Sequence, residues 1–131
     1  TDGALLAGRL ALYWTGKGHC TPSVADGQRD YDAIFRASLT AREAVWKNDL
    51  AQLADAARQS YAVQRAEGMD ALPGDPAAKD AAALDANRPL AWKYCGGGFG
   101  GYAAYLFATP AERDTACKLP GFRPVEPFVH E

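Results

Sequence analysis

Apolar and polar positions recur at two different periods along the chain, and these periods divide it into segments. Residues 9–16, "RLALYWTG", form a short apolar and aromatic run closed by glycine, which is typical of a buried strand that ends in a loop. From Arg29 onward the apolar spacing is three and four residues, which predicts a helix. Its two adjacent stripes are Ile34, Ser38, Ala41 and Val45, and Tyr31, Phe35, Leu39, Arg42 and Trp46. We therefore expect this helix to be largely buried.

A second helix is predicted to begin directly after the first. Asn48 and Asp49 can accept hydrogen bonds from the free amides of a first helical turn, and Gly68 can end the helix. One face of this segment carries apolar residues at helical spacing, namely Leu50, Leu53, Ala54, Ala57 and Tyr61. The start signal and the spacing together favour a helix over this stretch.

The clearest local signal lies in residues 72–87, "LPGDPAAKDAAALDAN". Asp75 can accept from the amides of a first turn, and Pro76 stands where a missing N–H does no harm. Asn87, followed by Pro89, stops the segment. The pattern predicts a short, alanine-rich third helix.

Two strands and a fourth helix are predicted next. Residues 90–95 and 102–108 are strand-like and enclose a glycine-rich segment. "TPAE" then repeats the start of a helix, with Thr109 as its cap, Pro110 at its first position and Glu112 able to reach back to the Thr109 amide. We expect that helix to end near Gly121.

The order of the predicted elements is strand, three helices, strand, strand, helix, strand. The last strand, in "FRPVEPFVH", belongs on a sheet edge because Pro124 and Pro127 cannot donate to a ladder. This order is a split β-α-β arrangement with an enlarged first crossover. It predicts an α+β, ferredoxin-like domain over residues 1–131, with a four-stranded, mainly antiparallel sheet and helices packed on one face.

Composition narrows the classes of partner and the compartment. The 131 residues are 48% apolar, which is enough for one core, and the net charge is −2 with acids and bases mixed. No basic face argues for nucleic acid or an anionic membrane, and no apolar run approaches the ~20 residues of a membrane span. Cys20, Cys95 and Cys117 are odd in number and far apart, which favours reduced thiols in a cytoplasmic protein. His19 beside Cys20 has no partner at a recognised metal-ligand spacing, so we predict no metal site.

The glycine-rich segment "CGGGFGG", residues 95–101, demands a reason, because each glycine costs roughly 0.5–1 kcal/mol relative to alanine inside a regular element. Gly96, Gly98 and Gly101 match G-x-G-x-x-G, but a strand follows them where a dinucleotide loop needs a helix. Two interpretations remain open. The segment is a flexible hairpin connection, or its bare backbone lies against a phosphate or another phosphate-holding loop.

Residues 93–101, "KYCGGGFGG", resemble the third signature motif of the GHMP kinases, a superfamily that includes galactokinase, homoserine kinase and mevalonate kinase. In that motif a Lys or Arg is followed, after two or three residues, by Gly-Ala-Gly-x-Gly-Gly. "LALYWTG" is similar to the strand ending in Tyr-Thr-Gly in the heptose-kinase-like sugar branch. From about Arg9 to the end, the order of elements also resembles the C-terminal domain of that family. The family's ATP-holding loop, Pro-x-x-x-Gly-Leu-x-Ser-Ser, is missing from this sequence, so the N-terminal ATP-binding domain is expected to be absent from the chain.

The resemblance implies the substrate-side domain of an ATP-dependent kinase that phosphorylates a hydroxyl of a sugar or another small molecule. It implies ATP and Mg²⁺ in the full-length enzyme, with neither bound tightly by this domain alone. Thr15 and Gly16 would border the substrate pocket, and no catalytic residue is assigned. The implied phosphate or substrate loop comprises Lys93, as the nearest cation, with Gly96, Gly97, Gly98, Phe99, Gly100 and Gly101.

A second hypothesis makes the chain a non-catalytic α+β module that binds a ligand or dimerises. Under the kinase hypothesis its partners are a sugar or sugar phosphate and an N-terminal kinase lobe. An exposed apolar face would mark the place where such a lobe docks, and we expect an isolated copy to cover that face by forming a homodimer.

Overall fold

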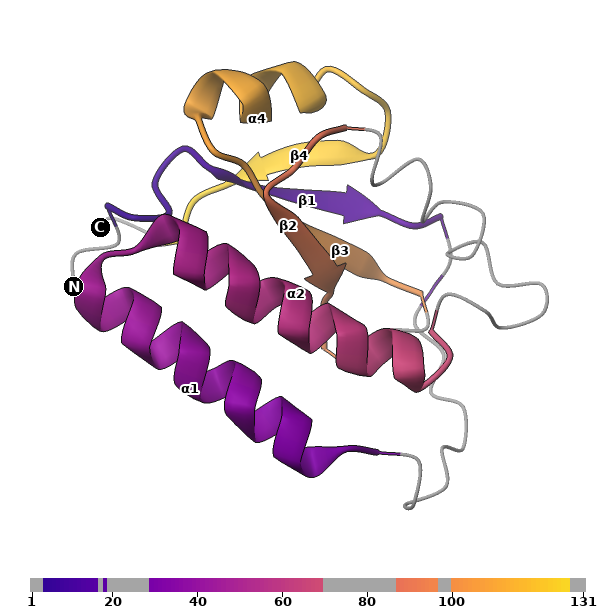
Figure 1. Cartoon of the computed structure of the whole chain (residues 1–131). Helices are drawn as coiled ribbons and strands as arrows, with labels where there is room; N and C mark the ends of the chain where they lie inside the picture. The colour runs from indigo at the N-terminus through magenta and orange to yellow at the C-terminus, as the bar shows by residue number, and fades with distance from the viewer. Residues whose placement is uncertain (1–3, 17, 19–28, 70–86, 97–99, 128–131) are drawn as a thin grey trace.

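The computed structural model describes residues 4–16, 18, 29–69, 87–96 and 100–127, and over these ranges its elements follow the predicted order (Figure 1). The predicted third helix, from Asp75 to Asn87, lies outside the described residues except for its last position, where Asn87 is part of a turn. The strands are β1 (Leu10–Trp14), β2 (Ala91–Tyr94), β3 (Tyr102–Leu106) and β4 (Phe122–Val125), and the helices are α1 (Tyr31–Lys47), α2 (Leu50–Ala66) and α4 (Pro110–Ala116).

The four strands form one sheet in the order β2-β3-β1-β4, and every neighbouring pair is antiparallel. Within β1, Tyr13 lies opposite Ala103 of β3 and Phe122 of β4. The ferredoxin-like split β-α-β class is therefore confirmed. The expectation that the helices pack on one face is wrong, because α4 packs against the face that carries Tyr105 and the first half of α2 against the face that carries Leu106. The edge position predicted for the proline-containing last strand is confirmed as well, because among the described strands β4 pairs with β1 alone, and it contains Pro124.

Two hydrophobic clusters lie on opposite faces of this sheet, because successive residues of a strand point to opposite sides. The first face presents mostly aromatic residues and packs against Ala116 of α4. It also packs against Tyr61 of α2 and against Met69, which lies just after α2. Its strand residues are Ala11, Trp92, Tyr94, Ala103, Tyr105 and Phe107. The second face places Ala91 and Leu106 against the first half of α2. Helix α2 reaches both faces because it runs along the β2 edge.

The side chain of Gln64 covers the β2 edge of the sheet. The Gln64 Nε2 donates a hydrogen bond to the carbonyl oxygen of Tyr94 at 2.9 Å, and the Tyr94 N–H donates to Gln64 Oε1 at 3.0 Å. Gln64 is 7% exposed and thus supplies one donor and one acceptor, as a neighbouring strand would. A second contact at the same edge runs from Arg58 to the carbonyl oxygen of Leu90.

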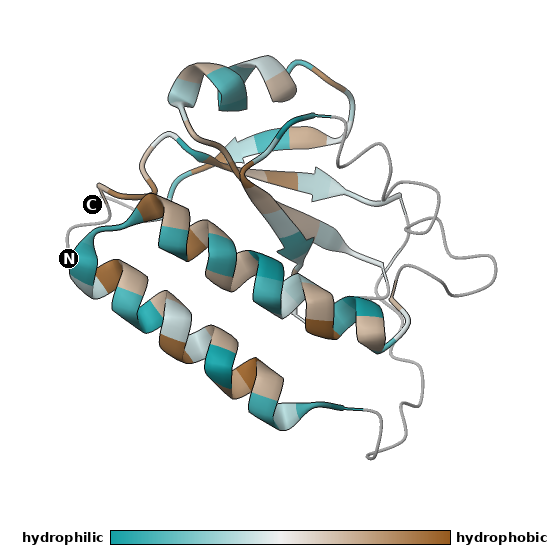
Figure 2. Cartoon of the chain, in the orientation of Figure 1, coloured by the Kyte–Doolittle hydropathy of each residue, from teal (hydrophilic) through white to brown (hydrophobic). Residues whose placement is uncertain are grey.

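The expectation that the first long helix is largely buried is wrong. Helix α1 packs side by side with α2 (Figure 1), and its buried residues are Ala37 and Ala44. Hydrophobic residues recur along α1 (Figure 2), yet Phe35 is 62% and Trp46 is 79% exposed. The reason is that α1 meets α2 through small alanines, so the stripe of large side chains faces away from the protein.

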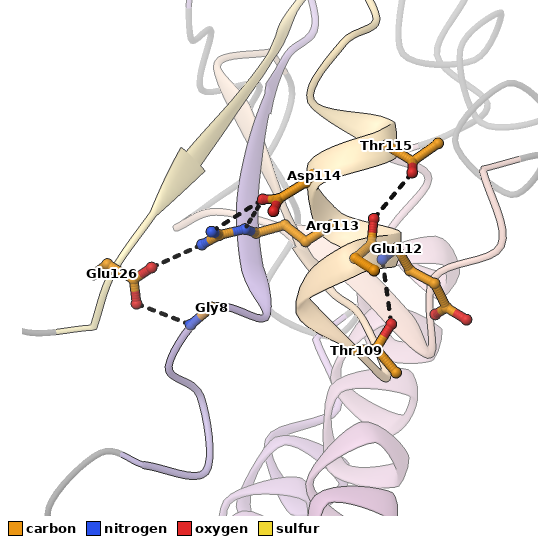
Figure 3. A network of polar contacts seen from close by, with 8 residues as sticks. Gly8, Thr109, Glu112, Arg113, Asp114, Thr115 and Glu126 are labelled. Carbon is orange, nitrogen blue, oxygen red and sulfur yellow. Dashed lines mark hydrogen bonds and ion pairs between the residues drawn. The ribbon is translucent and has the colours of Figure 1, made fainter.

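The capping signals are confirmed at two helix starts. Asp49 accepts from the Gln52 N–H at 3.0 Å at the start of α2, and Thr109 accepts from the Glu112 N–H at 3.2 Å at the start of α4 (Figure 3). The predicted end of the last helix is wrong, because α4 ends at Ala116. The chain then continues through turns to Gly121, whose φ of +89° brings it into β4.

Candidate functional site

The end of β1 and the end of the glycine-rich segment meet at one end of the sheet. Both the N–H and the Oγ1 of Thr15 donate hydrogen bonds to the carbonyl oxygen of Gly101, at 3.0 Å and 2.7 Å. Thr15 is 3% exposed, so this contact is part of the fold. The structure thus brings Thr15 and Gly16 next to the segment with which the resemblance associates them, across a sequence separation of 86 residues.

The described glycines of this region share a backbone conformation that favours glycine. The φ angles are +83° at Gly16, +57° at Gly96, +99° at Gly100 and +79° at Gly101. A Cβ added at Gly16 or at Gly96 would meet nothing within 4 Å. Conformation rather than crowding therefore requires glycine at these two positions, and their open sides leave backbone accessible. The remaining loop candidates, residues 97–99, lie outside the described residues.

The segment does form a hairpin connection. Strands β2 and β3 pair antiparallel, and the Cys95 N–H donates to the carbonyl oxygen of Tyr102 at 2.9 Å just before the connection closes. The interpretation that this segment connects two antiparallel strands as a hairpin is therefore confirmed. The phosphate interpretation concerns what this connection binds, which its hairpin geometry does not determine.

Lys93 lies in β2, opposite Ala104 of β3, and is half-buried. Its neighbours Trp92 and Tyr94 belong to the first face, so Lys93 projects from the second face. Among the ion pairs of the described residues none involves Lys93. Its ammonium group is thus a cation close to the glycine-rich connection that no described carboxylate neutralises.

Cys95 is positioned beside this site but lacks the properties of a nucleophile. Loss of water around the thiol raises its pKa, and the charge of Lys93 acts in the opposite direction. A raised pKa keeps the thiol protonated near neutral pH, and the protonated form is the unreactive one. Among the residues that the structure describes, no group of three His, Cys, Asp or Glu side chains could hold a metal ion, while His19 and Cys20 lie outside that part of the chain.

Sequence reasoning missed an aromatic pair at the same end of the sheet. Trp14 and Tyr102 are opposite one another in the β1–β3 register, and their ring centroids are 4.9 Å apart. They remain 41% and 38% exposed and project from the second face. Half-exposed aromatic rings provide an apolar surface with a polar handle, which suits the face of a sugar ring. Only the strand register brings these two residues together.

An apolar groove of about 440 Å³ lies along the second face of the sheet. One wall is formed by Ile34 and Ala41 of α1 with Leu53 of α2, and the other wall includes Ala104 and Lys93. Lys93 therefore lines the groove and belongs to the strand that leads into the glycine-rich connection.

Comparisons of the chain with protein-family models, with curated proteins and with solved structures found no match. Within the described part of the chain, no helix has the length and apolar character needed to cross a membrane.

Proposed function

We propose that this chain is the substrate-side domain of an ATP-dependent kinase of the GHMP type, which transfers a phosphoryl group to a hydroxyl of a sugar or another small molecule. The observation that carries the proposal is the contact between Thr15 and Gly101, which joins the end of β1 to the glycine-rich connection. Both segments carry the residues on which the resemblance rests.

The chemistry of phosphoryl transfer suits what these residues offer. Such enzymes work mainly by positioning the reactants and stabilising charge, which backbone amides and cations can do. In the proposal, accessible backbone at Gly96 lies against a phosphate, and the ammonium group of Lys93 attracts it. Thr15 and Gly16 border the acceptor, and the exposed rings of Trp14 and Tyr102 support its apolar face.

The nucleotide and its metal depend on a partner lobe in this proposal. ATP supplies the phosphoryl group, and Mg²⁺ neutralises the charge of its phosphates. The described residues contain no cluster of acidic side chains for Mg²⁺. The fit is therefore limited to the phosphate, with Lys93 and backbone amides as its partners, and we expect only weak binding by this domain alone.

Nuclear magnetic resonance of the ¹⁵N-labelled chain tests the proposal because it detects weak binding residue by residue. The probes are ATP with Mg²⁺, inorganic phosphate, and a panel of hexoses and heptoses with their phosphates. We expect millimolar binding that shifts the amide signals of Thr15, Gly96, Gly100 and Gly101.

Two lysine variants sharpen this test. Lys93→Ala should weaken the shifts produced by ATP and by phosphate, whereas Lys118→Ala, which removes an exposed lysine beyond α4, should leave them unchanged. Absence of shifts at the four amides with every probe up to about 10 mM would contradict the proposal. The chain would then belong to the second hypothesis, a non-catalytic ligand-binding or dimerisation module.

A further inference from the structure

The outer face of α1 is mostly apolar, with the exposed side chains of Ser38 and Arg42 lying among its large residues. Around the helix, Tyr31, Phe35, Leu39 and Trp46 fall within one quarter turn, and Val45 lies beside them. All five residues are exposed, from 36% for Val45 to 79% for Trp46. We call these five residues the outer stripe of α1. The stripe is turned away from α2, which packs against the opposite side of the helix through Ala37 and Ala44.

The area of the outer stripe is that of an interaction surface. An aromatic side chain carries roughly 150–250 Å², so the exposed fractions of Tyr31, Phe35 and Trp46 leave on the order of 400 Å² of aromatic surface. The largest apolar patch on a typical monomer is about 300–600 Å², and it often marks a binding site. A stable interface buries about 800 Å² per partner, of which the stripe and its flanking charged side chains would supply the centre and the rim.

The charges beside the stripe are complementary to those of a second copy of the chain. One flank of α1 carries Asp32, Arg36, Glu43 and Lys47, all exposed and alternating in sign. Within the chain, Lys47 pairs with Glu43 at 2.6 Å, and Glu43 also accepts from Gln52 of α2 at 2.9 Å. In an antiparallel pair of identical helices related by a two-fold axis, the same flank of each helix faces its counterpart in reverse order. Asp32 then lies beside Lys47 of the partner subunit, and Arg36 lies beside Glu43 of the partner subunit. Both pairs are centred between positions 39 and 40, close to the middle of the helix.

The apolar residues obey the same symmetry. Reversal about Leu39 places Tyr31 opposite position 47, next to Trp46 of the partner subunit, and Phe35 opposite position 43, next to Arg42 of the partner subunit, where a guanidinium can lie over a ring. Leu39, as the middle residue of α1 (Tyr31–Lys47), meets its own counterpart at the two-fold axis. We propose that the chain forms a symmetric dimer in which the outer stripes of two α1 helices pack antiparallel. This dimer does not depend on the proposed kinase function.

Sedimentation of the whole chain over a range of concentrations, with and without a substitution in the stripe, tests the dimer. We expect a reversible dimer with a dissociation constant on the order of micromolar to tens of micromolar. Leu39→Asp should raise that constant by about tenfold or more, because it places two charges at the axis. The matched control is Leu119→Asp, since Leu119 has nearly the same exposure (44% against 45%) but lies beyond α4. It should leave the constant unchanged.

Oxidative cross-linking tests the orientation. In the antiparallel dimer, Leu39→Cys should form a disulfide between position 39 of the two chains, identified by peptide mapping apart from the native thiols. Tyr31→Cys should not cross-link to itself, because its two copies lie about 24 Å apart along the helices and a disulfide needs Cα atoms within about 7 Å. A monomer at about 100 μM, a dimer that survives Leu39→Asp, or cross-linking at both positions would overturn the proposal.

Discussion

Glycine at positive φ has two different consequences in this fold. Gly68 and Gly121 share a φ of +89°, a conformation that other residues rarely adopt. At Gly68 an added Cβ would meet nothing within 4 Å, so conformation is the only restriction. At Gly121 the same atom would lie 3.0 Å from Cε2 of Tyr13, so the turn into β4 also requires space. Tyr13 in turn packs against Phe122, with ring centroids 4.7 Å apart.

Alanine at these two positions should therefore have unequal effects. Gly68→Ala introduces backbone strain alone and should lower the free energy of unfolding by about 1–2 kcal/mol. Gly121→Ala adds a displacement of the Tyr13 ring inside an aromatic cluster and should cost about 1–3 kcal/mol more. Urea unfolding followed by circular dichroism gives both values. Equal losses for the two variants would mean that Tyr13 moves aside without cost.

The candidate site was predicted from sequence only as far as short-range patterns and the resemblance extend. The glycines and Lys93 form a contiguous segment, and Thr15 with Gly16 was associated with that segment through the resemblance. The exposed pairing of Trp14 with Tyr102 depends on the register of two strands that are far apart in the sequence. This register cannot be predicted from a local sequence pattern. The sequence alone therefore does not distinguish Trp14 and Tyr102 from aromatic residues of the core.

At the scale of elements, β2 shows how a helix can protect a sheet edge. An exposed edge strand offers unpaired N–H and C=O groups to other chains. Here Gln64, within α2, satisfies both groups of Tyr94, and Tyr61 packs on Trp92 with ring centroids 4.1 Å apart. The glutamine thus fixes the position of α2 along β2 as well as covering the edge.

Replacing this glutamine with leucine should be costly despite the similar size. Gln64→Leu leaves the buried N–H and C=O groups of Tyr94 without these partners, at about 1–3 kcal/mol for each group. We expect a loss of about 2–6 kcal/mol in the free energy of unfolding, measured in urea. Gln59→Leu is the matched control, because Gln59 is an exposed glutamine of the same helix. A Gln64→Leu variant as stable as the control would show that water replaces the lost hydrogen bonds.

Helix and strand boundaries show which structural information is local. Asp49 and Thr109 cap their helices as predicted, because a cap needs only residues three positions apart. The prediction that α1 is largely buried is wrong because the spacing of its apolar residues indicates only the width of the apolar face. The spacing does not indicate whether another element covers that face. The end of α4 was placed too late for a related reason, since the turns before Gly121 resemble a continuing helix in sequence.

At the scale of the whole molecule, one carboxylate joins three segments that are distant in sequence. Glu126 follows β4, and its Oε2 accepts a hydrogen bond from the Gly8 N–H at 3.0 Å (Figure 3). Its Oε1 accepts from Arg113 Nη1 of α4 at 2.8 Å. The segment before β1, the last helix and the last strand are therefore held at one point on the surface of the protein.

These contacts make the stability of the fold depend on pH in a defined direction. The hydrogen bond from the Gly8 amide, followed by that from Arg113, lowers the pKa of Glu126 below its ordinary value of 4.5. Because the pKa is lower in the folded state than in the unfolded state, the stabilisation is complete above about pH 4.5 and is lost as the pH falls through the folded value. The free energy of unfolding of the wild-type protein should therefore exceed that of Glu126→Gln at pH 7, and the difference should shrink below pH 4.5.

Ionic strength separates the two contributions to this difference. At roughly 1 M NaCl the Debye length falls to about 3 Å, so the attraction between Glu126 and Arg113 is weakened while the hydrogen bond from Gly8 persists. Part of the difference at pH 7 should then remain in high salt. Unfolding in urea at a series of pH values, with low and high salt, measures both effects. A difference that is constant from pH 7 to about pH 3 would contradict the assigned role of the carboxylate, because a protonated Glu126 cannot differ from glutamine through its charge.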